Sequence, residues 1–274
     1  MRIVFLILII TFSSLARPSW ACGPTSHCKV DDGRHYRIRM PENHDGKTPV
    51  GAIIFAHSFG ATAVGTIRNK NLIKAANDLG VALVAPKSRG RDWHIPNSPE
   101  NKTPPAQLEA RYFDNIIDDM TKRFPIDRSK LLMTGVSAGG MMTWQLICER
   151  GDKFAAFVPI AGTFWHPQPK NCKTPPAHVM HVHGTTDTVV PITGRNARGS
   201  KQGNVYDVMN MYAALGKFKG NKRPKPLDMN CKSTKNASGK ILALCFHEGG
   251  HKFDAAHIAH AWRQFEAAGA FKNR

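Results

Sequence analysis

The sequence predicts an α/β fold in which a mostly parallel sheet carries helices on both faces. Short apolar runs alternate with stretches of helical periodicity along the chain. The run VGAIIFA at 50–56 is continuously apolar, which is typical of a strand buried on both faces. Alternation of this kind indicates a parallel sheet. With 42% apolar residues, the 274-residue chain can bury a sizeable core.

The elements follow one another without an internal repeat or a linker. Strands are expected at 34–40, 50–56, 81–85, 130–134, 155–160, 177–182 and 241–246. Helical spacing covers 64–79, 106–124, 138–150, 204–215 and 254–268. Asp254 stands near the start of the last helix, where a carboxylate is favourable. A long loop at 86–105 joins the third strand to the second helix, and a single domain is expected at 22–274.

The first residues have the pattern of a signal peptide at 1–21. Arg2 precedes the apolar run 3–12, and Ser19-Trp20-Ala21 offers a small-x-small cleavage site before Cys22. Ten apolar residues are too few to cross a bilayer, which needs about 20. We therefore expect a secreted protein, extracellular or periplasmic, that has no integral membrane association.

An exported chain with an even number of cysteines is expected to form disulfides. Local pairing would close short segments between neighbouring elements, although six cysteines allow 15 pairings. The favoured pairs are Cys22 with Cys28, Cys148 with Cys172, and Cys231 with Cys245. The chain has no Cys/His cluster at zinc spacing, so no metal site is expected.

Positive charge dominates the composition. The chain has 38 Lys+Arg against 20 Asp+Glu, and loss of Arg2 and Arg17 with the leader lowers its formal charge from +18 to +16. Export argues against nucleic acid as a partner. The segment 195–240 holds eleven Lys/Arg, which indicates either a solvated face or a surface for an anionic wall or matrix polymer.

Ser137 has the sequence context of a nucleophile elbow. The stretch LLMTGVSAGG at 131–140 is a strand, a G-x-S-x-G turn and the start of a helix. Glycines on either side let strand and helix approach closely while the serine hydroxyl stays exposed. The alternative is a glycine-rich turn in which Ser137 only caps the helix.

A serine nucleophile needs a base and a group that orients the base. In α/β-hydrolases these follow in the order Ser, acid, His. Asp187 comes just after the expected strand 177–182, and His251 lies in a glycine-rich loop after the last strand. We therefore assign Ser137 as nucleophile, Asp187 as the orienting acid and His251 as the general base.

Other interpretations of these positions remain open. Asp187 also suits an Asx turn, because it stands in Thr-Thr-Asp-Thr. His181 and His183 alternate on a strand and are expected to be structural. The rival bases are His247, His257 and His260.

An acyl-transfer site also needs hydrogen-bond donors for the developing oxyanion. The backbone N–H of Ala138 is one candidate, and that of Phe59 in the loop after 50–56 is the other, unless that loop is a plain turn. Trp93, Phe164 and Trp165 are expected in loops at the carboxyl edge of the sheet. They either bind substrate there or pin the loops to the domain.

Three ordered motifs resemble a known family. IDRSKLLMTGVSAGGMM, HGTTDTVVP and the terminal GGH are similar to the secreted polyhydroxybutyrate depolymerase-like esterases, relatives of feruloyl and acetyl xylan esterases in the α/β-hydrolase superfamily. The resemblance implies an α/β-hydrolase fold and a serine esterase without metal or organic cofactor. It implies small or oligomeric substrates, either hydroxyalkanoate oligomers or feruloyl or acetyl sugar esters. Two departures are Ser58 in place of the usual glycine and Lys252 in place of the usual tryptophan.

Two other functions remain open on the sequence. A serine peptidase or an acyltransferase uses the same triad. A basic wall-binding or matrix-binding protein with little activity would explain the charged segment 195–240.

Overall fold

The computed structural model describes residues 21–30, 33–100, 106–222 and 227–271, so nearly all of the expected signal peptide lies outside the described residues. Within this part of the chain, a ten-stranded sheet has the order β1-β2-β4-β3-β5-β6-β7-β12-β11-β10. The strands are β1 (Cys28–Lys29), β2 (His35–Arg39), β3 (Val50–Ala56), β4 (Ala82–Pro86), β5 (Ile126–Val136), β6 (Ala156–Ile160), β7 (His178–Gly184), β10 (Lys219–Lys222), β11 (Met229–Lys235) and β12 (Ile241–His247).

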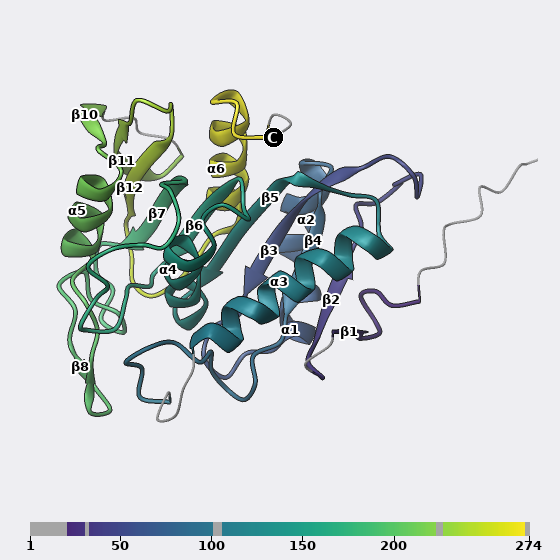
Figure 1. Cartoon of the computed structure of the whole chain (residues 1–274), viewed down its shortest axis with the longest axis horizontal. Helices are drawn as coiled ribbons and strands as arrows, with labels where there is room; N and C mark the ends of the chain where they lie inside the picture. Colours follow the sequence, from purple (N-terminus) through teal and green to yellow (C-terminus); the bar gives the residue numbers. More distant parts are fainter. Residues whose placement is uncertain (1–20, 31–32, 101–105, 223–226, 272–274) are drawn as a thin grey trace, which may run out of the picture.

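The centre of the sheet is parallel and its edges are antiparallel. Neighbours from β4 through β3, β5, β6 and β7 to β12 all pair in parallel. At one edge β1 and β2 run antiparallel, and at the other β11 and β10 do. The predicted mostly parallel α/β sheet is therefore confirmed. Its carboxyl ends lie at the lower side of Figure 1, where the small hairpin of β8 (Asn196–Ala197) and β9 (Ser200–Lys201) also lies.

Helices cover both faces, and each face has its own hydrophobic core. One core includes side chains of α3 (Ala106–Arg123), α4 (Ala138–Arg150) and α5 (Val205–Leu215). The opposite core includes side chains of α1 (Ala63–Ile67), α2 (Lys70–Asp78) and α6 (Ala255–Ala267). In Figure 1, α3 lies in front of the sheet and α1 and α2 lie behind it. Helix α4 is buried along its length from Ala138 to Cys148, which places it at the centre of the molecule.

Local capping explains where several helices begin. The Asp254 carboxylate accepts a hydrogen bond from the Ala256 N–H and caps α6, as the sequence predicted. The single helix expected at 64–79 is divided in the structure. Asn69 has an extended backbone and its side chain accepts bonds from the Asn71 and Leu72 N–H groups, so a new helix begins there.

The basic segment 195–240 contributes two strands to the large sheet, β10 and β11, that the sequence pattern did not reveal. In β11 only Met229 and Cys231 are buried, and Lys232 and Lys235 are exposed. Strand β10 lies outside β11 and carries the exposed Lys219 and Lys222. Lysines on an edge strand hinder pairing with another sheet. Part of the positive charge is thus accounted for by the sheet edge itself.

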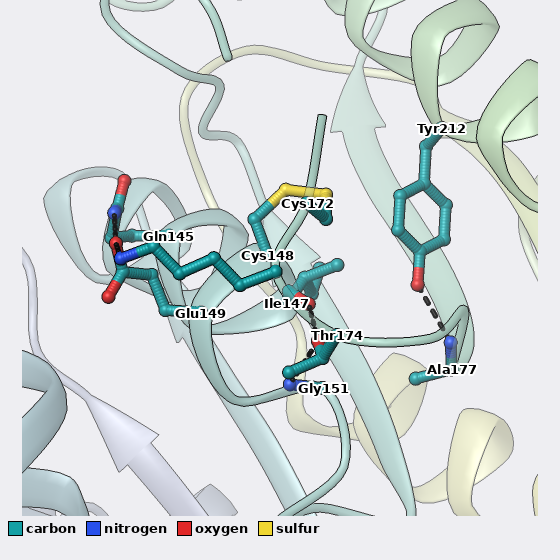
Figure 2. The surroundings of a disulfide bond; sticks show 10 residues. Gln145, Ile147, Cys148, Glu149, Gly151, Cys172, Thr174, Ala177 and Tyr212 are labelled. Carbon is teal, nitrogen blue, oxygen red and sulfur yellow. Dashed lines mark hydrogen bonds and ion pairs between the residues drawn. A yellow bond between two sulfur atoms is a disulfide. The ribbon is translucent and has the colours of Figure 1, made fainter. Parts of the chain in front are cut away.

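Three disulfides form with the pairing that the sequence favoured. Cys22 bonds to Cys28 at the start of the described chain. Cys148 near the end of α4 bonds to Cys172, and Figure 2 shows the Thr174 hydroxyl bonding nearby to Gly151 N and Ile147 O. Cys231 and Cys245 face each other across β11 and β12. None of the helices in the described ranges is long and apolar enough to span a bilayer.

Gly139 is the position in the fold that tolerates a side chain least. A β-carbon there would lie 1.9 Å from the Ala56 carbonyl oxygen, which is rigid backbone. We expect Gly139→Ala to lower the free energy of unfolding by about 3 kcal/mol or to prevent folding. Urea denaturation measures this. Gly90→Ala is the matched control, because nothing lies within 4 Å of its β-carbon position. Equal stability of the two variants would contradict the close approach.

Candidate active site

Ser137 occupies a strained turn between β5 and α4. Its backbone has φ 59° and ψ −121°, a conformation that costs free energy for a residue with a side chain. The side chain makes no capping hydrogen bond to α4, so the alternative of a plain capping serine is not what the structure forms. A nucleophile elbow requires this arrangement, with the hydroxyl left available at the end of the strand.

The glycines around Ser137 make the turn possible. A β-carbon on Gly135 would lie 2.6 Å from the Ala56 oxygen, and one on Gly140 would lie 2.3 Å from the Ile160 oxygen. The Ser137 N–H donates to that same Ile160 oxygen at 3.0 Å. Backbone atoms of β3 and β6 therefore lie too close to the turn at Ser137 for a side chain at either glycine.

Asp187 lies in the loop after β7 and is buried, with an exposed fraction of 5%. Its Oδ1 accepts hydrogen bonds of 2.9 Å from the N–H groups of Val189 and Val190. This is the Asx turn that the sequence suggested, and it leaves the second oxygen for another partner. The turn and the orienting role are therefore compatible.

His251 supplies that partner. Its Nδ1 donates to Asp187 Oδ2 at 2.7 Å, and its side chain is 20% exposed. Burial acts to raise the pKa of Asp187, but the hydrogen bonds from His251 and from the Val190 N–H outweigh burial and hold that pKa below its ordinary value. A carboxylate only accepts, so His251 carries a proton on Nδ1, and in the neutral ring the lone pair is then on Nε2. This is the tautomer that a general base requires.

Two of the rival histidines have other partners. His247 Nδ1 donates to the Glu248 carbonyl at 3.1 Å, and His257 Nε2 bonds to Asp228 at 2.6 Å. His260 lies one turn further along α6. The structure therefore brings Asp187 together with His251 and with none of these three.

The loop after β3, the candidate oxyanion loop, lies against the turn at Ser137. A β-carbon on Gly139 would also be 2.9 Å from the His57 oxygen. The Gly60 N–H donates to Arg91 O and the Ala61 N–H to Ser58 O. In the described chain the Phe59 N–H is bonded to no backbone carbonyl. Phe59 thus remains the candidate donor of this loop, beside Ala138 at the start of α4.

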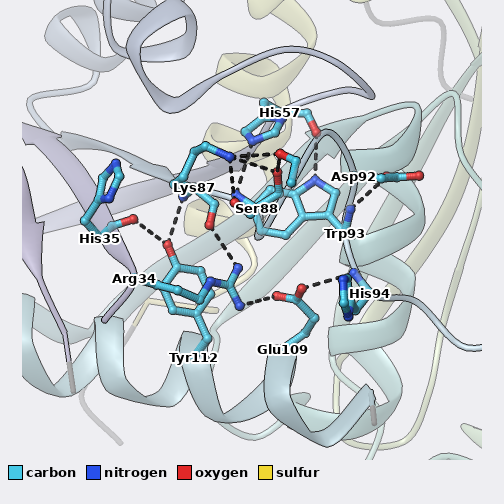
Figure 3. A network of polar contacts seen from close by, with 11 residues as sticks. Arg34, His35, His57, Lys87, Ser88, Asp92, Trp93, His94, Glu109 and Tyr112 are labelled. Carbon is cyan, nitrogen blue, oxygen red and sulfur yellow. Dashed lines mark hydrogen bonds and ion pairs between the residues drawn. The ribbon is translucent and has the colours of Figure 1, made fainter. Parts of the chain in front are cut away.

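A polar network braces this loop from the far side (Figure 3). The Trp93 indole N–H donates to His57 O at 2.8 Å, and His57 Nε2 accepts from the Ser88 N–H at 3.3 Å. Burial lowers the pKa of His57, which keeps this imidazole neutral. Behind it, Glu109 bonds to the His94 N–H and to the buried Arg34 guanidinium. His57 and Trp93 therefore hold the loop in place.

The three aromatic residues that were expected to bind substrate are buried, and their contact with substrate stays a prediction. Trp93, Phe164 and Trp165 have exposed fractions of 0%, 2% and 8%. Trp93 is occupied with His57, Phe164 packs on Trp144 with ring centres 5.7 Å apart, and the Trp165 backbone pairs with Gln202. These side chains pin loops to the domain, which is the alternative that the sequence left open.

Two arginines beside the loop were missed by sequence reasoning. The guanidinium carbons of Arg91 and Arg198 lie 5.0 and 4.7 Å from the Phe59 ring centre. Arg198 comes from the turn between β8 and β9 and also pairs with Glu100 at 2.8 Å. The sequence showed only a general excess of positive charge, because both arginines are distant from Phe59 along the chain and come close to it only in the folded structure. Among the described residues, no group of three or more His, Cys, Asp or Glu could hold a metal ion.

Comparison with solved structures decides the fold type. The acetyl xylan esterase from Aspergillus awamori matches with a TM-score of 0.64 at 17% identity, covering 88% of this chain and 98% of that one. The chain has the α/β-hydrolase fold. The feruloyl esterase module from Clostridium thermocellum complexed with sinapinate gives a TM-score of 0.59 at 15% identity, covering 95% of this chain and 92% of that one.

The chain also has relatives by sequence. Residues 73–166 match the prolyl oligopeptidase family. The putative esterase NocK of Nocardia uniformis subsp. tsuyamanensis is 28% identical over 165 residues, covering 59% of this chain and 47% of that protein. Feruloyl esterase D of Neurospora crassa is 25% identical over 179 residues, covering 60% and 57%. The chain thus spans about half the length of these relatives, which are named esterases.

The lowered pKa of Asp187 makes its stabilising effect depend on pH. Because the folded pKa lies below the unfolded value of about 3.9, the stabilisation is complete above that value and is lost as the pH falls through the folded pKa. We expect Asp187→Asn to lower the free energy of unfolding by about 2 kcal/mol near neutral pH. Denaturation at pH values on both sides of the transition measures this. The difference in the free energy of unfolding between wild type and variant should become smaller in acid. A difference that does not change with pH would contradict the lowered pKa of Asp187.

Proposed function

We propose that this hydrolase is a secreted serine esterase that cleaves carboxylic esters through an acyl-enzyme. The observation that carries the proposal is the bond between His251 Nδ1 and Asp187 Oδ2, at the same sheet edge as the strained Ser137 turn. The named esterases among its relatives and structural neighbours support the same reaction class. The mature chain would begin at Cys22 and form one catalytic domain over 22–274.

The chemistry follows from the roles of these groups. The Ser137 hydroxyl attacks the ester carbonyl carbon while His251 Nε2 takes its proton. The N–H groups of Ala138 and Phe59 stabilise the oxyanion that forms. Collapse of the tetrahedral intermediate breaks the bond to the alcohol, which leaves with the proton from His251. Water then attacks the acyl-enzyme with His251 as base, and the acid is released as Ser137 regains its proton. Asp187 orients the imidazole in both steps.

The positive charge beside the candidate oxyanion loop supports substrates that carry a negative group. The Arg91 guanidinium lies over Phe59, and its Nη2 is 3.5 Å from where a Gly60 side chain would begin. Arg198 adds a second guanidinium, partly balanced by Glu100. A cation at this position attracts esters that carry a carboxylate elsewhere in the molecule. We therefore propose acidic esters, such as hydroxyalkanoate oligomers with a free acid end or esters of acidic sugars, beside feruloyl and acetyl sugar esters.

A peptidase is the second candidate, because residues 73–166 match the prolyl oligopeptidase family. The same triad cleaves amides when the leaving amine is protonated by the histidine. Matched ester and amide substrates with one acyl group separate the two functions. Amide cleavage at a rate comparable to ester cleavage would favour the peptidase.

The basic segment remains a proposal for binding to an anionic wall or matrix polymer. Its exposed lysines on β10 and β11 lie at the far edge of the sheet from β4. Three disulfides suit an oxidising compartment outside the cytosol. Retention on an anionic matrix, measured with and without salt, tests this role separately from turnover.

Ser137→Ala is the decisive test of the nucleophile. We expect hydrolysis of a short-chain p-nitrophenyl ester to fall by about 10⁴-fold or more, since the acyl-enzyme cannot form. The substrate should still bind, because the oxyanion loop is untouched. Ester turnover that persists in this variant would sink the esterase proposal. Ser129→Ala is a matched control on the same strand, where the hydroxyl only bonds to Asp127.

Arg91→Ala tests the substrate class. The ratio of kcat/KM for an anionic ester over that for its neutral methyl-capped partner should fall about fivefold, as expected for one exposed charge. High salt should produce the same fall in the wild type. Arg128→Ala removes an equal charge near the amino end of β5, where the guanidinium pairs with Asp118. A similar change in both variants would show that only net charge matters.

A further inference from the structure

A continuous row of buried ring nitrogens runs from α4 to the loop that holds Asp187. The Trp144 indole Nε1–H donates to His181 Nδ1 at 3.1 Å. His181 Nε2 bonds to His183 Nδ1 at 2.9 Å, and His183 Nε2 bonds to the Val190 carbonyl at 2.8 Å. The three side chains have no exposed surface, so water does not compete for these bonds.

The two ends of the row fix its direction. An indole N–H only donates and a carbonyl oxygen only accepts. His181 Nδ1 must therefore be a bare acceptor, so His181 carries its proton on Nε2 and donates to His183 Nδ1. By the same logic His183 carries its proton on Nε2 and donates to Val190 O. Each imidazole is left with one tautomer, and every ring nitrogen has a partner.

The same geometry opposes a positive charge on either ring. A second proton on His181 would face the indole N–H, and one on His183 would face the His181 N–H. Burial lowers the pKa of both residues, for His181 well below the ordinary value. The titratable groups that act on His183 are Asp187 and His251 in the neighbouring loops and His247 at the end of β12. Attraction to Asp187 does not overcome burial, so both rings stay neutral.

At its far end the row reaches both oxygens of Asp187. Val190, whose carbonyl accepts from His183, donates its own N–H to Asp187 Oδ1 at 2.9 Å. His183 Nε2 lies 3.5 Å from Oδ2, the oxygen that accepts from His251. The row therefore holds the Asp187 loop to β7 and helps to fix the direction in which the carboxylate points.

We propose that Trp144, His181 and His183 form a positioning relay that anchors the Asp187 loop to the helix of the nucleophile. The relay rests on the proposed function for its kinetic role. His183 is a neutral neighbour of Asp187 that cannot replace His251, because its Nδ1 lone pair is already used. The carboxylate is thus held for one base only.

The first experiment reads the tautomers in the wild-type enzyme and needs no variant. Long-range ¹H–¹⁵N spectra should show His181 and His183 as neutral rings protonated on Nε2 from about pH 5 to pH 8. Trp144→Phe keeps an aromatic ring but removes the indole donor, so the long-range ¹H–¹⁵N signals of the His181 ring should change. A proton on Nδ1, or titration of either ring in this range, would overturn the relay. This readout does not depend on ester hydrolysis.

The second experiment compares His183→Gln with His183→Leu. The glutamine amide keeps a donor near the Nε2 position, whereas leucine fills similar space without one. We expect kcat to fall by about 10- to 100-fold in His183→Leu, as happens when a residue that orients a functional group is lost. KM should stay nearly unchanged. His183→Gln should recover most of the lost kcat. Equal losses in both variants, or none in either, would contradict the relay. If Ser137→Ala still hydrolyses esters while His181 and His183 show the expected tautomers, the proposed function is contradicted and the relay is not.

Discussion

The close contact between the Ala56 carbonyl and the glycines around Ser137 is the constraint on which the rest of the site depends. Only residues without a β-carbon let α4 begin where β3, β5 and β6 end. Because the chain continues from Ala56 directly into His57 and Phe59, the same contact that admits the turn at Ser137 also places the candidate oxyanion loop beside it. The strained backbone of Ser137 persists because the surrounding backbone leaves it no relaxed alternative.

Two buried polar networks support this contact from opposite sides. Trp93 and Ser88 hold His57 on the β4 side, and Trp144 leads through His181 to the Asp187 loop on the β7 side. In both networks burial lowers the pKa of the histidines, so they donate and accept without gaining charge. His251 differs from them in that it is partly exposed and faces a carboxylate. The candidate site therefore contains one partly exposed histidine beside a carboxylate, and the other histidines of these networks are buried.

The sequence predicted the features that are encoded locally. The turn around Ser137, the Asx turn of Asp187 and the Asp254 cap each depend on a few adjacent residues, and all three form. The central parallel strands were also recognisable, because strands buried on both faces are continuously apolar. The divided helix at Asn69 was missed because its overall periodicity is helical, although the cap could have been read from the asparagine.

Features that depend on distant contacts were not predictable in this way. The lysine-rich strands β10 and β11 have few buried residues, so their pattern resembles that of a solvated segment. Trp93 looked like a pocket residue because it stands in a long polar loop, yet the fold brings the His57 carbonyl to its indole. The placement of Arg91 and Arg198 on Phe59 likewise requires three separate segments to meet.

The disulfide between Cys231 and Cys245 has a consequence for the alignment of the last two long strands. The two cysteines are directly opposed, so the bond permits one register between β11 and β12. A slip of one residue would turn every side chain of β12 to the other face and shift the start of the loop that carries His251. The disulfide therefore fixes the residue at which the chain leaves β12. Through that register, two cysteines outside the candidate site help to determine where His251 lies.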